Sequence, residues 1–297
     1  MEEPVAPRNE DCCGSGCNPC VFDIYEKQLK IYKKFLNDGP MGECATKVSP
    51  ENGIKQLVYT EFIIVKKHLI CDNHCLIMFN KITPECPKVY WKPGDHFLFK
   101  YTSNLTSCTR AYTPFILETE ACDFAIIIKL YDNGIVSPYL YNLAVGCTTL
   151  WRGPYGHYDL KHSKFDKIVM IAQGTGLTAF IDIIGSVLDD EDDTTKLILF
   201  YCCRSTETIL FRDKLYSYKS YWNFNYNIYI SPSITDSKLK YQEPIHNKKL
   251  CLDDLVVEAM ALSGNDQILI CGSQQFNESF KTTLEKEMPL IKNIVLF

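Results

Sequence analysis

Long apolar runs are missing from this sequence of 297 residues. No stretch reaches the roughly 20 apolar residues that a membrane-spanning helix needs, so we expect no membrane span. The first residues, Met1-Glu2-Glu3-Pro4, lack an apolar core, which argues against a secretory signal or an Arg-rich transit peptide. Position 2 is not Gly, so N-myristoylation is not expected. We therefore expect a cytoplasmic protein with reduced cysteines, and the mitochondrion stays open as an alternative.

An excess of basic residues is also missing, because the formal net charge is −5. Nucleic-acid binding needs a concentrated basic face, so we expect no nucleic-acid partner. A local basic patch for docking an acidic protein remains compatible with this charge. The hydrophobic fraction of 46% and the charged fraction of 23% are typical of a soluble globular protein, and the length suffices for two domains.

Cysteine, in contrast, is concentrated near the N-terminus. Three of the cysteines there match the C-x4-C-x2-C spacing of one iron–sulfur type, and structural zinc could also hold so short a segment together. The alternative is a set of free thiols ahead of an amphipathic helix over residues 22–35. The candidate metal ligands are Cys12, Cys13, Cys17 and Cys20.

Short β-branched and aromatic runs follow, separated by turn signals such as Lys92-Pro93-Gly94-Asp95. This spacing predicts an antiparallel barrel or sandwich. Ser137 is expected to cap a short helix whose first amides can face a phosphate. The segment 151–156 is expected to close the β region as a turn. The five runs are 59–66, 74–79, 97–101, 110–115 and 124–131.

One of these runs begins with Arg110-Ala111-Tyr112-Thr113-Pro114. A guanidinium can pair with a pyrophosphate through two parallel hydrogen bonds, and a Tyr ring can pack on a flavin or its ribityl chain. A Thr hydroxyl can donate or accept a hydrogen bond at the flavin edge. The pentapeptide therefore suits a flavin dinucleotide, and the alternative is an ordinary strand end terminated by Pro.

After about residue 160, apolar strand runs alternate with helical stretches. This alternation predicts a parallel sheet with helices on both faces. Gly174-Thr175-Gly176 follows the first strand and opens a helix, where a dinucleotide pyrophosphate could reach helix amides. Cys271-Gly272-Ser273 ends the fourth strand, at the carboxyl edge where ligands bind in such sheets. The five expected strands are 168–172, 197–201, 226–230, 267–271 and 293–296, and the helical stretches between them are 179–188, 207–218, 252–262 and 276–287.

Five motifs occur in a fixed order over about residues 55–297. The set resembles the ferredoxin reductase-like flavoproteins and, within them, the NADH-cytochrome b5 reductase family. The N-terminal cysteine-rich segment resembles a small oxidoreductase-like domain. The motifs are Arg110-Ala-Tyr-Thr113, Gly134-Ile-Val-Ser137, Arg152-Gly-Pro-Tyr-Gly156, Gly174-Thr-Gly-Leu-Thr178 and Cys271-Gly272.

The resemblance implies an α/β plus β fold. A cysteine-rich segment over 1–36 and a linker over 37–56 would precede an antiparallel β-barrel FAD domain over 57–160. A parallel five-stranded α/β domain over 161–297 would bind the nicotinamide dinucleotide. The two domains would press the flavin ring between them.

The resemblance also implies roles for single residues. Thr113 would lie at the flavin N5 edge, and Ile127 and Lys129 would line the site shared by flavin and nicotinamide. Cys271 would border the reactive nicotinamide carbon, so the catalytic candidates are Thr113, Lys129 and Cys271. The candidates for binding FAD are Arg110, Ala111, Tyr112, Thr113, Ile135, Val136 and Ser137, and those of the second domain are Gly174, Thr175, Gly176, Thr178 and Gly272, with Thr178 approaching the flavin.

The implied activity is an FAD-dependent reductase that takes a hydride from NADH and passes single electrons to a haem protein such as cytochrome b5. The cofactors would carry the redox chemistry, and no acid–base triad is required or evident. Ala111 and Ser273 stand where the family usually has Pro, and Ile135 stands where it has Lys or Gly. NADPH stays open, because Asp236 is offset from the carboxylate expected to disfavour it.

A second hypothesis belongs to another class. The chain would be a flavoprotein-derived binding or assembly factor, whose N-terminal cysteines hold a metal or a partner. Rapid flavin reduction by NADH would count against this hypothesis.

Overall fold

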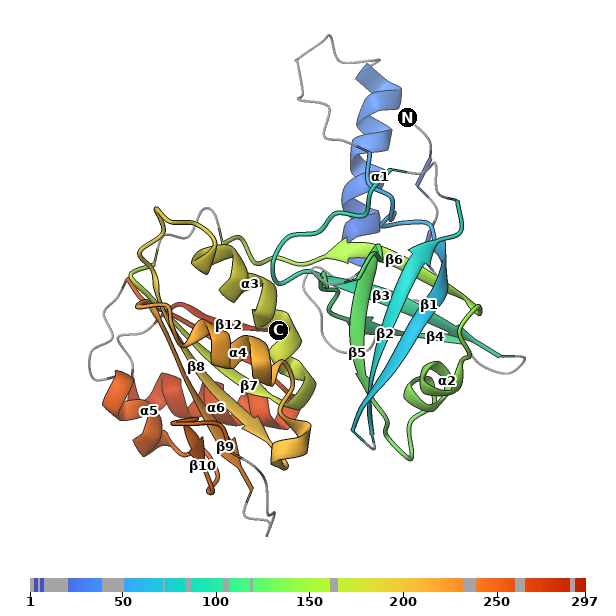
Figure 1. Cartoon of the computed structure of the whole chain (residues 1–297). Coiled ribbons are helices and arrows are strands. Elements are labelled where there is room, and N and C mark those ends of the chain that lie inside the picture. Colours follow the sequence, from blue (N-terminus) through green and yellow to red (C-terminus); the bar gives the residue numbers. More distant parts are fainter. Residues whose placement is uncertain are drawn as a thin grey trace. The chain divides into compact units, whose positions relative to one another are not determined.

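The structure is a computed structural model of the whole chain (Figure 1). The chain divides into two compact units, each considered by itself below. Unit 1 comprises residues 1–69 and 73–158, and unit 2 comprises residues 70–72 and 159–297. The structure describes residues 3–4, 6–7, 21–38, 51–71, 73–83, 87–103, 107–117, 120–160, 165–231, 239–259, 265–288 and 292–297.

Unit 1 is built on a six-stranded sheet with the order β4-β3-β6-β1-β2-β5. The pairs β1–β6, β2–β5, β3–β4 and β3–β6 are antiparallel. The outermost strands β4 and β5 also contact each other, so the sheet curls around its core as the predicted barrel requires. The strands are β1 (Thr60–Cys71), β2 (His74–Lys81), β3 (His96–Thr102), β4 (Ser107–Tyr112), β5 (Phe124–Lys129) and β6 (Thr148–Tyr155).

The core of unit 1 is aromatic. The ring of Phe124 stacks on Phe79 with centroids 4.9 Å apart and meets the edge of Trp151 at 5.4 Å. Trp151 is fully buried. The prediction of a turn over 151–156 was therefore wrong for most of that segment, because β6 runs to Tyr155 and residues 151–153 and 155 are buried.

In its described residues, unit 1 has two helices, α1 (Val21–Asp38) and α2 (Val136–Asn142). The helix expected over 22–35 is present and reaches Asp38. Within the segment expected to be a linker, Ile54 is buried in the core cluster of unit 1. None of the helices in the described ranges combines the length and apolarity needed to cross a membrane.

Unit 2 is a sheet with the order β10-β9-β8-β7-β11-β12, and its strand pairs are parallel. Each predicted strand is confirmed within a residue or two. The sheet has six strands rather than the predicted five, because β10 is too short to leave a pattern in the sequence. The strands are β7 (Lys167–Gln173), β8 (Lys196–Cys203), β9 (Phe224–Ile230), β10 (Ile245–His246), β11 (Gln267–Cys271) and β12 (Ile294–Leu296).

Helices cover both faces of this sheet, as predicted. Tyr229 of β9 belongs to a buried cluster with Leu255 of α5 and Leu284 of α6. Tyr226 points to the opposite face, because side chains alternate along a strand. There it stacks on Phe224, which contacts Tyr218 of α4. The helices are α3 (Thr178–Leu188), α4 (Arg212–Tyr218), α5 (Leu252–Ala259) and α6 (Gln274–Glu287), with short 3-10 turns η2 (Gly174–Leu177) and η3 (Thr206–Thr208).

Candidate functional site

The end of β4 carries the residues expected to bind the flavin. Arg110 is exposed, and its Nη1 donates to the carbonyl of Thr109 at 2.8 Å. Ala111 is exposed, and Thr113 is half-buried directly after the strand. The half-buried ring of Tyr112 lies 5.9 Å from the ring of Trp151. Burial raises the pKa of Tyr112 well above its ordinary value, so its phenol stays neutral.

β5 places the next two candidates. Ile127 is buried and pairs with Leu76, so its side chain belongs to the wall of the barrel. Lys129 is half-buried at the last position of the strand, opposite His74. Its Nζ lies 5.3 Å from the ring centroid of Tyr131, within reach of a cation–π interaction.

Ser137 does not cap α2, so that prediction was wrong. The helix begins at Val136, and Ile135 occupies the N-cap position without a side-chain hydrogen bond. The Oγ of Ser137 therefore lies within the first turn and accepts a hydrogen bond from the amide of Tyr131 at 3.2 Å. Ile135 is 59% exposed, whereas Val136 and Ser137 are buried.

The elements of unit 1 that carry these candidates are neighbours. α2 contacts both β4 and β5, and the Tyr139 ring lies 4.8 Å from that of Tyr101 in β3. Sequence reasoning missed Lys67, whose Nζ donates to the carbonyls of Tyr141 and Leu143 at 2.5 and 2.6 Å. An isolated Lys on a strand gives no signal of such a contact.

These residues fit a flavin dinucleotide. The exposed guanidinium of Arg110 suits an anionic pyrophosphate, and the Tyr112 ring offers a half-buried plate near it. At Gly134 a Cβ would lie 2.8 Å from the Oγ of Ser137, so the chain enters α2 through a turn that has no room for a side chain.

In unit 2 the candidates gather at the carboxyl edge of β7 and β11. The chain adds β8, β9 and β10 on one side of β7, and β11 and β12 on the other. The boundary between β7 and β11 is thus the switch point of the sheet, where open α/β sheets bind ligands. Register brings Ala172 opposite Cys271, so the two loops that follow are adjacent.

The glycines at this edge allow close approach. Gly174 has φ +56° and nothing within 4 Å of the position of a Cβ, so it offers an open backbone surface. A Cβ at Gly176 would lie 2.2 Å from the carbonyl oxygen of Cys271, and one at Gly272 would lie 2.8 Å from the Cβ of Gln173. The open backbone at Gly174 fits the close approach of a dinucleotide backbone, and Gly176 and Gly272 let the two loops pack against each other.

The hydroxyl of Thr178 is turned inward. Thr178 is buried, and its Oγ1 donates to the carbonyl of half-buried Thr175 at 2.8 Å. Burial raises the pKa of the Cys271 thiol to about 12, so this side chain is a neutral thiol at pH 7.

Sequence reasoning also missed Gln173 as a site residue. The Oε1 of Gln173 accepts hydrogen bonds from the amide of Ser273 at 3.2 Å and from its Oγ at 3.0 Å. The only available signal was the position of Gln173, one residue before the glycine loop.

The N-terminal cysteines Cys12, Cys13, Cys17 and Cys20 lie outside the described residues, so their metal binding stays a prediction. Among the residues that are described, no group of three His, Cys, Asp or Glu side chains could hold a metal ion.

Comparison with family models divides the chain into three matches. Residues 61–160 match the oxidoreductase FAD-binding domain, and residues 170–282 match the oxidoreductase NAD-binding domain. Residues 1–38 match the N-terminal domain of oxidoreductase-like proteins. FAD and a nicotinamide dinucleotide, the cofactors expected from the sequence, are thus the cofactors of the two matched domains.

Whole-length relatives agree with this division. The NADH-cytochrome b5 reductase-like protein of Mus musculus is 30% identical over 95% of this chain and 91% of its own length. The protein of the same name from Homo sapiens is 29% identical over 95% of this chain and 90% of its own length.

Among solved structures, the cytochrome b5 reductase domain of Ulva prolifera nitrate reductase has the same fold. The TM-score is 0.70 at 20% identity, and the match covers 83% of this chain and all of that domain. An FAD-binding and an NAD-binding oxidoreductase domain in one chain, with whole-length identity of 30%, show that the chain belongs to the NADH-cytochrome b5 reductase-like family.

Proposed function

We propose that this protein is an FAD-dependent NADH reductase that delivers single electrons to a haem protein of the cytochrome b5 kind. The observation that carries the proposal is the whole-length similarity to NADH-cytochrome b5 reductase-like proteins. The grouping of the flavin candidates on β4, β5 and α2 supports it, as does the grouping of the nucleotide candidates at the β7–β11 edge.

In unit 1 the residues would bind and orient the flavin. Bound FAD supplies the conversion of a two-electron hydride into single electrons. Arg110 would pair with the pyrophosphate through its exposed guanidinium, and Ser137 and Val136 would place the first turn of α2 beside it. Tyr112 would pack its neutral ring on the cofactor, and the Thr113 hydroxyl would hydrogen-bond the flavin edge.

In unit 2 the residues would hold the nicotinamide nucleotide. The open backbone at Gly174 would let the dinucleotide approach the main chain, and the close contact between Gly176 and Cys271 would hold the two loops together. The Cys271 thiol would border the nicotinamide as a neutral group that takes no part in proton transfer. This side chain would act by shape and by excluding water.

The decisive experiment is a visible spectrum of the purified full chain, recorded before and after anaerobic addition of NADH. We expect stoichiometric flavin that NADH bleaches, followed by reduction of added cytochrome b5. Absence of flavin after FAD addition, together with no NADH oxidation by an artificial acceptor, would overturn the proposal. Bleaching would in turn count against a binding or assembly factor without redox activity.

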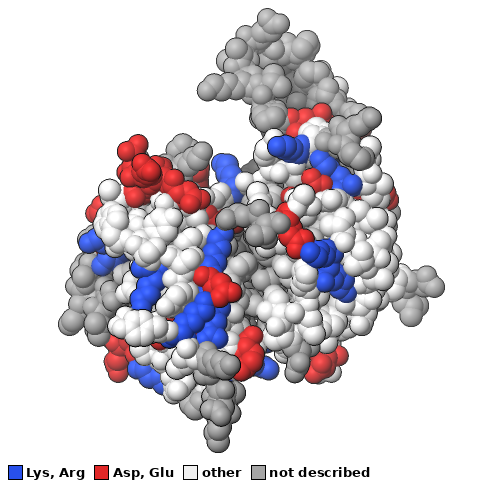
Figure 2. Space-filling model, in the orientation of Figure 1, with Lys and Arg blue, Asp and Glu red and all other residues white. Residues whose placement is uncertain are grey.

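The identity of the electron acceptor is a separate part of the proposal, with its own test. Figure 2 shows basic side chains over α4 of unit 2, with acidic side chains among them. Two residues of α4 form ion pairs: Arg212 pairs with Glu243, and Asp213 pairs with Lys240. If an acidic haem protein docks electrostatically, its reduction rate falls steeply as salt rises, while ferricyanide reduction changes less. Reduction of ferricyanide without any haem protein being reduced would overturn the acceptor assignment alone.

A further inference from the structure

Two loops that are distant in the sequence interlock at the switch point of unit 2. The first follows β7 and contains Gly176, and the second follows β11 and contains Gly272. Each glycine lies where a side chain would collide with the other loop, at the carbonyl of Cys271 and at the Cβ of Gln173. The main chains are therefore in direct contact, and the groups on this edge have little freedom to move apart.

Gln173 is joined to the second loop by a pair of hydrogen bonds. Its Oε1 accepts from the amide of Ser273 at 3.2 Å and from the Ser273 hydroxyl at 3.0 Å. The Ser273 oxygen itself accepts from the amide of Phe276 at 3.3 Å, at the start of α6. The Ser273 hydroxyl thus accepts a hydrogen bond from α6 through an oxygen lone pair and donates its proton to the Oε1 of Gln173.

This arrangement fixes which way the Gln173 amide faces. A main-chain N–H can only donate, so the atom opposite the Ser273 amide must be the carbonyl oxygen of the side chain. The Nε2 group, with two N–H donors, then points away from Ser273. Gln173 is exposed at the carboxyl edge of β7, where ligands of such sheets bind.

We infer that Gln173 is a nucleotide-binding residue whose Nε2 donates a hydrogen bond to an acceptor oxygen of the nicotinamide dinucleotide. Ser273 is a positioning residue, since it holds the amide in the orientation that presents these donors. The inference rests on the proposed function of unit 2 and adds two residues to its site. A phosphate oxygen and the carboxamide oxygen of the nicotinamide offer the same acceptor chemistry.

The test is the dissociation constant of NAD⁺, measured by calorimetry on the FAD-loaded full chain. Gln173→Met removes donor and acceptor, and we expect the constant to rise about tenfold. Gln173→Glu still accepts from Ser273 but cannot donate, and its charge repels the pyrophosphate, so we expect at least the same rise. Binding of ADP-ribose, which lacks the nicotinamide, identifies the acceptor. If Gln173→Met loses as much affinity for ADP-ribose as for NAD⁺, the acceptor is a phosphate oxygen. If its affinity for ADP-ribose is unchanged, the acceptor is the carboxamide oxygen.

The matched control is Gln274→Met, one residue beyond Ser273. The Nε2 of Gln274 donates to Glu278 at 2.8 Å along the exposed side of α6, so this variant is expected to bind NAD⁺ like the wild type. If the NAD⁺ dissociation constant rose as much in Gln274→Met as in Gln173→Met, the inference would be overturned. The loss of affinity would then follow from changing any polar side chain on this surface.

Ser273 is tested through a double-mutant cycle. Ser273→Ala keeps the main-chain donor and loses the hydroxyl, so we expect a smaller rise, of about threefold, in the NAD⁺ constant. Combined with Gln173→Met it should add nothing, since Ser273 acts through Gln173. In steady-state assays of Ser273→Ala, the KM for NADH should rise while kcat is nearly retained. A loss of protein stability alone would not produce this pattern.

Two results would overturn the inference. One is an unchanged NAD⁺ constant in both Gln173 variants while the wild type binds NAD⁺ normally. The other is full additivity of the Ser273 and Gln173 effects, which would remove the positioning role. Failure of the wild type itself to bind NAD⁺, or to be reduced by NADH, would instead overturn the proposed function.

Discussion

Lys67 in β1 donates a hydrogen bond from its Nζ to the carbonyl of Leu143, the residue that follows α2, at 2.6 Å. The same group donates to Tyr141 at 2.5 Å. A cation at the carboxyl end of a helix satisfies carbonyls that lack an intrahelical partner and complements the helix dipole. The contact thereby ties α2, with its flavin candidates, to the barrel.

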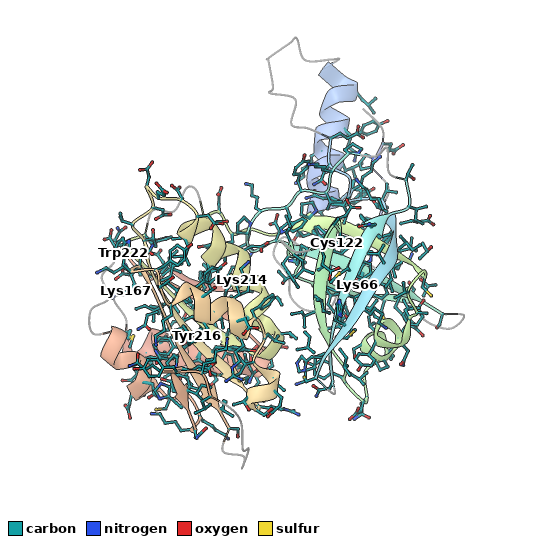
Figure 3. The ribbon with its side chains drawn as sticks, in the orientation of Figure 1. Lys66, Cys122, Lys167, Lys214, Tyr216 and Trp222 are labelled. Carbon is teal, nitrogen blue, oxygen red and sulfur yellow. The ribbon has the colours of Figure 1, made fainter. Side chains whose placement is uncertain are left out.

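Lys67→Met should lower the stability of the flavin-free protein by about 1–3 kcal/mol, because hydrogen bonds from a charged donor are lost. FAD affinity should fall as well, since α2 is no longer anchored. Urea unfolding and FAD titration measure the two effects. Lys66→Met is the control: Lys66, the preceding residue of β1 (labelled in Figure 3), is exposed and pairs with half-buried Glu120, so little change is expected. Equal effects of both variants would contradict the anchoring role.

Arg110→Ala should raise the FAD dissociation constant about 10- to 100-fold, the equivalent of losing about 1.5–3 kcal/mol from a charge-assisted hydrogen bond. The guanidinium is exposed, so its removal should leave the fold intact. Fluorescence titration of free flavin measures the constant, and Arg204→Ala, an exposed Arg after β8, is the control. Normal flavin retention in Arg110→Ala would remove Arg110 from the site.

Cys271→Ala should slow hydride transfer more than it weakens FAD binding. The pKa of the thiol is raised to about 12 by burial, so the group is neutral on both sides of pH 8. The ratio of wild-type to variant rates, measured by stopped flow, should therefore be constant between about pH 6 and 9. A ratio that changes near the ordinary pKa of a thiol would show that the group ionises there.

Glu243 should make the stability of the protein sensitive to acid. Its side chain is fully buried, and it accepts from Nε of Arg212 at 2.7 Å and from the amide of Lys240 at 3.0 Å. Burial alone would raise the pKa of Glu243, but the hydrogen bonds from Arg212 and Lys240 outweigh it, so the pKa lies below the ordinary 4.5. A carboxylate whose pKa is lowered by folding stabilises the protein fully above its unfolded value, and this stabilisation is lost as the pH falls through the folded value.

Glu243→Gln should therefore lower the free energy of unfolding by about 2–4 kcal/mol at pH 7, because Arg212 loses its counter-charge. The difference from the wild type should shrink as the pH falls below 4.5. Denaturant unfolding at several pH values measures it. The control is Asp213→Asn, since Asp213 pairs with Lys240 at the surface and its side chain is 97% exposed. A difference that does not depend on pH would show that charge is not its cause.

Much of unit 2 was predictable from sequence because its strands leave strong local signals. Runs such as 168–172 are buried on both faces and hence continuously apolar, and a glycine loop between such a run and a helix is typical of a nucleotide-binding edge. β10 was not predictable, because two residues pairing with β9 carry no periodicity. Its pairing depends on where the tertiary structure leads the chain.

In unit 1 the wrong predictions came from residue types that suggest a turn or a helix cap but take another role in the fold. Arg152, Gly153 and Pro154 suggested a turn, yet β6 continues through them because Trp151 and Tyr155 pack inward. Ser137 had the residue type of a helix cap, but the helix starts two residues too early for that role, with Ile135 at the N-cap position. In unit 2, Gln173 and Ser273 were missed because they are 100 residues apart and only the strand order brings them together.

The mutual contact of the two glycine loops bears on the transplantation of cofactor sites. A segment of a homologue grafted after β7 alone would meet an unmatched surface at Cys271, and one grafted after β11 alone would meet Gln173. Chimaeras should fold and bind nucleotide only when both segments come from the same parent. The segments that follow β7 and β11 must therefore be exchanged together, although they lie far apart in the sequence.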